Sequence, residues 1–147
     1  MKSSIAGAVG FFLPATLIGL LFCAVSLVTR TAPGKDGSST LDDFLLPAYL
    51  IVFVMTFATI GFLITTAASS AWRGLVARKA MFVAAGLGLI CPLAHLVGLA
   101  GFAWIMLPLI RSVPWLGAAL MYTLPGVLLG AVAIVVAKHL QRHNGNA

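Results

Sequence analysis

The sequence predicts an all-α, polytopic membrane protein whose four transmembrane helices form a compact antiparallel bundle. Hydrophobic residues make up 61% of the 147 residues and charged residues 8%, and the mean hydropathy is +1.11. Soluble domains carry about 25% charged residues, so this composition excludes an ordinary soluble domain. A spanning helix needs about 20 apolar residues, and the stretches that qualify are 5–29, 43–69, 80–110 and 115–137. We therefore expect one transmembrane domain over residues 1–147.

The first stretch, residues 5–29, is expected to be a permanent helix. Lys2 precedes it, as in a signal peptide, but the apolar core of a signal peptide has only about 7–15 residues. A lipoprotein-type site at Cys23 is not expected, because the preceding residue, Phe22, is large. None of the four stretches alternates as a barrel strand does, so all of them should be helical.

Residues 30–42 are the predicted outer loop, which contains the turn-forming pairs Pro-Gly and Asp-Gly. All three acidic residues of the chain lie in or beside it: Asp36, Asp42 and Asp43. Thr40 and Asp43 have the spacing of a capping box that opens the second helix, with Asp42 and Asp43 at the positive end of the helix dipole. An outer acidic patch that contacts a partner or a cation is the alternative.

The third stretch, residues 80–110, exceeds the bilayer thickness and needs tilt, a kink or cover from neighbours. It contains Pro92, and Cys91 and His95 lie one helical turn apart. An ionisable residue at this depth is a functional candidate. A neutral imidazole could also join helices by hydrogen bonds to threonines of the other helices, which are Thr16, Thr56, Thr59 and Thr123.

A proton or substrate contact is the second interpretation of His95, and a metal or haem ligand is the third. Cys91 and His95 supply two ligands on one face, and Cys23 is the other intramembrane candidate, whereas a closed zinc site needs four ligands. We therefore expect no metal and no cofactor.

The fourth stretch, residues 115–137, is followed by a basic tail, residues 138–147, expected to rest on anionic headgroups. LPATLIG at residues 13–19 and LPGVLLG at residues 124–130 share four identities, as a weak inverted repeat would. Their prolines could kink both helices.

Small residues recur at helical spacing in all four stretches, and close packing of such residues joins helices in lipid. The residues expected to form helix contacts or polar contacts are Gly88, Cys91, His95, Gly98, Thr123, Gly126 and Gly130.

Positive residues predict that both termini lie in the cytoplasm. The side expected to face the cytoplasm carries Lys2 and the five cations expected to meet lipid headgroups, which are Arg73, Arg78, Lys79, Lys138 and Arg142. The other side carries Arg30, Lys35 and Arg111. Trp72, Trp104 and Trp115 lie near helix ends, as interfacial anchors do. The net charge of +6 thus reflects topology and attraction to anionic lipid rather than nucleic-acid binding.

The predicted helices contain no Asp, Glu, Lys or Arg at bilayer depth and the two cysteines form no Cys-x-x-Cys motif, so we expect no enzyme. The favoured function is protein–protein interaction, as an accessory subunit of a membrane complex or an immunity-type protein against a membrane-targeting toxin. The alternative is a small oligomeric transporter or channel that uses His95 and the proline-broken helices. Composition and the absence of glycosylation sequons suit the bacterial inner membrane.

Overall fold

The computed structural model describes residues 2–30 and 41–145, with the side chains of residues 98–106, 110, 144 and 145 left aside. These residues form α1 (Lys2–Arg30), α2 (Leu41–Ala68), α3 (Ala77–Ser112) and α4 (Pro114–Gly145). The described part is all-helical, as the sequence predicted. Segments of all four helices are long and apolar enough to cross a membrane, namely Lys2–Arg30, Leu41–Ala68, Ala77–Val97 and Pro114–His143.

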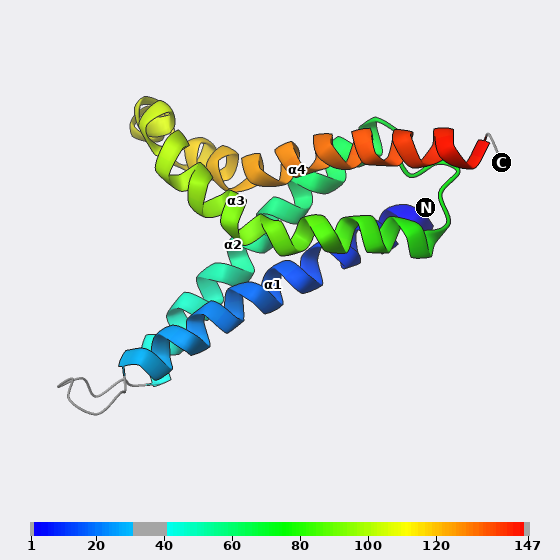
Figure 1. Cartoon of the computed structure of the whole chain (residues 1–147). Coiled ribbons are helices and arrows are strands. Elements are labelled where there is room, and N and C mark those ends of the chain that lie inside the picture. The colour runs from blue at the N-terminus through cyan, green and yellow to red at the C-terminus, as the bar shows by residue number, and fades with distance from the viewer. Residues whose placement is uncertain (1, 31–40, 146–147) are drawn as a thin grey trace.

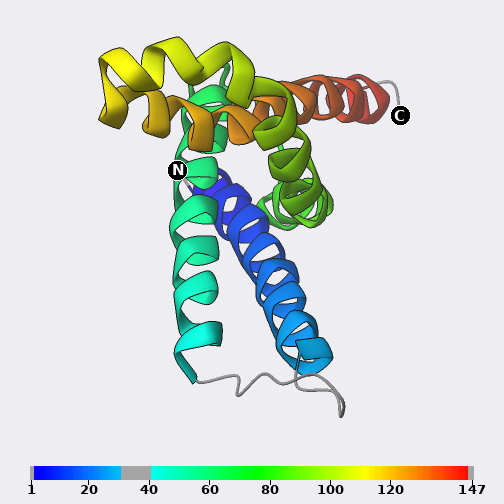
Figure 2. The same cartoon turned by 90° about the vertical axis from the view of Figure 1, so that its left-hand side faces the viewer.

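The four helices form two hairpins that diverge. Helices α1 and α2 make one hairpin and α3 and α4 make the other (Figure 1). The hairpins pack together at the end that carries both termini, and their far ends point away from each other (Figures 1 and 2). The molecule is therefore more open than the compact bundle that the sequence predicted.

Contacts between helices show their relative directions. Helices α1 and α2 run in opposite directions: Phe11 of α1 stacks on Phe62 of α2, whereas Gly19, further along α1, faces Ile51, further back along α2. Helices α1 and α3 run in the same direction, because Gly10 faces Met81 and Gly88 faces Phe11 and Pro14.

The same arrangement joins α2 to α4. Gly126 faces Ala58, and Gly130, one turn further along α4, faces Thr65, which is also further along α2. The closest packing thus includes helix pairs that are parallel and separated in sequence, a feature that the expected antiparallel bundle did not include.

Glycines permit these close approaches. A Cβ atom on Gly88 would collide with the carbonyl oxygen of Phe11, and one on Gly126 would collide with the carbonyl oxygen of Ala58. A Cβ on Gly10 would lie 2.6 Å from the carbonyl oxygen of Met81. Apolar side chains gain little by leaving the equally apolar lipid. Helices in lipid therefore associate through close van der Waals contacts such as these.

An aromatic cluster fills the end where the hairpins meet. The Phe11 and Phe62 rings are stacked with centroids 4.2 Å apart, and Trp72 lies 6.2 Å from Phe62. Trp72 is only 3% exposed, because the turn between α2 and α3 folds its indole against Gly7. Its environment differs from the interfacial one expected from sequence, whereas Trp115 is 73% exposed.

Helix α3 is bent near its middle, and α4 is longer than its apolar stretch. The 36 residues of α3 correspond to about 54 Å, well beyond the hydrocarbon thickness. Pro92 lies inside α3 and removes the hydrogen bond to the residue four positions earlier, which accounts for a bend at that place (Figure 2). Helix α4 continues through residues 138–145, where the sequence suggested a separate tail.

Candidate functional site

The buried polar side chains of the described residues are Thr66 and His95. His95 lies on α3, one turn beyond Pro92, and is 8% exposed. Its ring centroid is 5.8 Å from that of Tyr122 on α4, with the two planes tilted by 37°. Cys91, one turn earlier, is fully buried. The sequence-predicted pair therefore sits in the protein interior.

The hydrogen bond expected between His95 and a threonine is not formed within the described part of the chain. Among the described residues, His95 Nδ1 is buried and has no hydrogen-bond partner. Three of the four candidate threonines instead donate to carbonyl oxygens of their own helices, at 2.7 Å for Thr56, 2.7 Å for Thr59 and 2.9 Å for Thr123. The fourth, Thr16, has a buried hydroxyl that also lacks a partner in the described part of the chain.

The predicted small residues divide between two interfaces. Gly88 lies where α3 meets α1, and Gly126 and Gly130 lie where α4 meets α2. Thr123 also belongs to the second interface, since its carbonyl oxygen faces Gly61. Gly98 is within α3, but its surroundings are outside the described residues. His95 and Gly126 thus belong to different contacts and do not form one site.

An apolar groove of about 370 Å³ lies between α3 and α4 at the depth of their spanning segments. It runs along both helices, and the residues that line it are Ile90, Leu93, Ala94, Val97, Met121, Leu124, Pro125 and Leu128. No lining side chain can donate a hydrogen bond, so the groove suits an apolar occupant. The groove was not expected from the sequence, because its position depends on how α3 and α4 are rotated about their axes.

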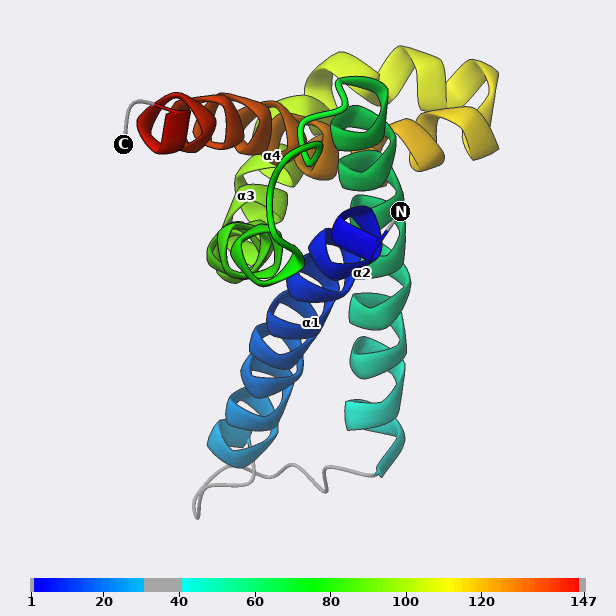
Figure 3. The ribbon, with the colours of Figure 1, turned by 90° about the vertical axis from the view of Figure 1, so that its right-hand side faces the viewer.

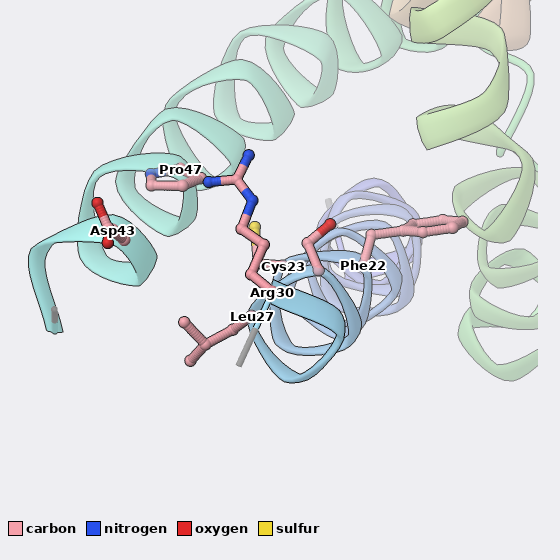
Figure 4. Close-up of a pocket in the computed structure, with 7 residues that line it drawn as sticks. Phe22, Cys23, Leu27, Arg30, Asp43 and Pro47 are labelled. Atoms are coloured by element: carbon pink, nitrogen blue, oxygen red, sulfur yellow. The ribbon is translucent and has the colours of Figure 1, made fainter. Parts of the chain in front are cut away.

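The end of the first hairpin that lies away from the termini has a smaller cavity of about 210 Å³. In Figure 4, Arg30 of α1 extends toward α2, where Asp43 and Pro47 lie. Cys23 lines the same cavity as a buried free thiol. Asp42 and Asp43 occupy the first turn of α2, as expected from sequence. Asp36 and Thr40, and with them the expected capping box, lie outside the described residues.

The end that carries the termini is basic. The five cations expected to meet lipid headgroups are all exposed there or beside it: Arg73, Arg78, Lys79, Lys138 and Arg142. The guanidinium carbon of Arg78 lies 5.9 Å from the centroid of the Phe82 ring, a cation–π distance.

A polar cavity of about 410 Å³, which was not expected from the sequence, opens at this basic end. Its lining residues come from the start of α1, the end of α2 and the α2–α3 turn: Ser3, Ser4, Thr66, Ala67, Ser70, Trp72, Arg73 and Gly74. The signal in the sequence was the presence of serines next to helix ends that share one membrane face.

Within the described residues, no group of three or more His, Cys, Asp or Glu side chains could hold a metal ion. Comparison of the chain with protein-family models, with curated protein sequences and with solved structures found no match.

Proposed function

We propose that this protein acts by protein–protein interaction within the membrane, as an accessory subunit of a membrane complex or as an immunity-type protein. The observation that carries the proposal is the apolar groove between α3 and α4, because its lining side chains Leu93, Val97 and Leu128 are more than half exposed. We further propose the cytoplasmic membrane of a bacterium as its location, with both termini in the cytoplasm.

The proposed occupant of the groove is a transmembrane helix of a partner protein. The groove extends over residues 90–97 of α3 and 121–128 of α4, about two helical turns of each. Ala94 is the small residue among the α3 residues that line it, so it leaves room for another helix to approach. Small residues in helix interfaces allow such an approach, and the favourable contacts are van der Waals ones.

Transport is the less supported function. The described helices meet through glycines in contact with carbonyl oxygens of the neighbouring helix, which leaves no room for a path between α1 and α3 or between α2 and α4. The buried polar side chains of the described helices are Thr66 and His95, and the Thr16 hydroxyl is buried as well, which is too few to line an aqueous route.

Photo-crosslinking from single positions tests the interaction. A photoreactive phenylalanine analogue at Val97 lies in the groove, and the same analogue at Val135 on α4 lies outside it; the two positions are 73% and 68% exposed. We expect a crosslink from Val97, but not from Val135, to a transmembrane segment of one other protein. Ala94→Phe should fill the groove and abolish that crosslink.

Equal crosslinking from both positions would indicate contact with lipid and contradict the proposal. A crosslink from Val97 to a second copy of the chain would show that the groove is occupied by self-association rather than by a partner protein. Ion or solute flux in liposomes that contain the purified protein alone would favour the transporter function instead.

A further inference from the structure

We propose that the polar cavity at the basic end of the molecule binds the phosphate group of an anionic phospholipid. The cavity lies between the first turn of α1, the end of α2 and the α2–α3 turn. Figure 3 looks onto this end of the molecule. Since these are the ends of spanning helices, the cavity lies at the depth of lipid headgroups.

The polar side chains that line the cavity can donate hydrogen bonds and carry no negative charge. The hydroxyl groups of Ser4 and Ser70 are half-buried and make no hydrogen bond with the described residues. Arg73 contributes a guanidinium group, a planar fork of donors that matches phosphate oxygens. Within the described part of the chain, the two hydroxyls and the guanidinium group have no side-chain partner, and together they suit an oxyanion with several acceptor oxygens.

The walls of the cavity are held in place by hydrogen bonds from two helices. Ser3 of α1 donates from Oγ to the carbonyl oxygen of Leu75 at 3.1 Å. Gln141 of α4 donates from Nε2 to the carbonyl oxygens of Ala71 and Arg73, at 3.3 and 2.6 Å. The backbone that carries Arg73 is therefore fixed before any ligand arrives, which reduces the entropy lost on binding.

The electrostatic field at this end favours an anion. The first turn of α1, which forms one wall, presents backbone N–H groups without intrahelical acceptors at the positive end of a helix dipole. The described acidic residues, Asp42 and Asp43, belong to the first turn of α2, at the other end of that helix. Anionic headgroups are attracted to such a basic membrane face.

Binding of single lipids to the full-length protein in detergent, measured by native mass spectrometry, tests the site. The probes are dioleoyl phosphatidic acid, dioleoyl phosphatidylcholine and inorganic phosphate. We expect phosphatidic acid to bind more tightly than phosphatidylcholine. Arg73→Gln should weaken the binding of phosphatidic acid about tenfold, as loss of a charge-assisted hydrogen bond does.

Arg78→Gln is the matched control, because it removes the same charge from the same end of the protein and Arg78 does not line the cavity. It should change the affinity less than about twofold, since a charge outside the cavity acts on the bound phosphate only through the screened field of this face. Ser4→Ala combined with Ser70→Ala should weaken binding severalfold with both arginines intact. Helical content from circular dichroism verifies that each variant is folded.

Two results would overturn the proposal: equal losses in Arg73→Gln and Arg78→Gln, or equal affinity for phosphatidic acid and phosphatidylcholine. Displacement of the lipid by millimolar inorganic phosphate would support a site for phosphate and show that a soluble source can fill it. Lipid binding that inorganic phosphate does not reduce would support the lipid as the source.

Discussion

Glycine residues set how close the helices come. Gly126 faces the carbonyl oxygen of Ala58, so a methyl group there must push α4 away from α2. We expect Gly126→Ala to lower the free energy of unfolding by about 1–3 kcal/mol, the usual cost of overpacking. Unfolding by sodium dodecyl sulfate, followed by circular dichroism in mixed micelles, measures this change.

Gly86→Ala is the control for that substitution. Gly86 is in α3, and a Cβ added to it would meet no atom within 4 Å. Alanine favours a helix over glycine by about 1 kcal/mol, so this variant should be as stable as the wild type or more so. Equal destabilisation by Gly86→Ala and Gly126→Ala would show that the helices are not in the described contact.

His95 allows a test of the structure against the expectation from sequence. If its imidazole joined two helices by a hydrogen bond, removing the imidazole would destabilise the protein. Since Nδ1 is buried without a partner among the described residues, His95→Leu should leave the free energy of unfolding unchanged or raise it by about 1–2 kcal/mol. The same titration with sodium dodecyl sulfate measures the free energy of unfolding of this variant. A decrease of more than about 2 kcal/mol would show that His95 makes a stabilising polar contact.

Among the elements, the α2–α3 turn depends on α4. Gln141→Glu keeps the size of the side chain but replaces the amide donor by a carboxylate, which would face the carbonyl oxygens of Ala71 and Arg73. We expect the free energy of unfolding to fall by about 1–3 kcal/mol and amide hydrogen exchange in the turn to increase. His143→Gln, an exposed change on the same helix, should have no such effect.

Hydrophobic patterning located the elements well. The helices begin and end within three residues of the apolar stretches, except that α4 continues to Gly145 rather than ending at residue 137. The last part of α4 is polar, so hydropathy gives no sign that it is helical. The pairing of α1 with α3 and of α2 with α4 could not be predicted, because small residues occur on several faces of every helix.

The candidate sites were predictable only by residue type. His95 was conspicuous as an ionisable residue in an apolar stretch, but whether it has a partner depends on the rotation of α3 against its neighbours. The serines of the polar cavity were inconspicuous, because Ser3 and Ser70 are far apart in sequence and meet only when the helix ends converge.

For the whole molecule, the position of both termini at one end predicts from which side of the membrane each end of the bundle can be labelled. Both termini lie at one end (Figure 1), and the basic residues predict that this end faces the cytoplasm. With the buried Cys23 and Cys91 left in place, His143→Cys should react with a membrane-impermeant maleimide in inside-out vesicles. Asp42→Cys should react in right-side-out vesicles. The opposite pattern would invert the orientation, and labelling of both on one side would contradict the four-span topology.

The parallel pairing of helices has a consequence for biosynthesis. The ribosome delivers α1 and α2 first, yet the residues that complement Gly10 and Gly61 belong to α3 and α4. After its insertion the first hairpin therefore exposes the surfaces around Gly10 and Gly61 to lipid until the second hairpin is inserted and packs against them. During that interval the first hairpin can be bound by insertion chaperones or degraded. Substitutions in the second hairpin that weaken its contact with the first, such as those at Gly126, should therefore reduce the yield of the complete protein as well as its stability.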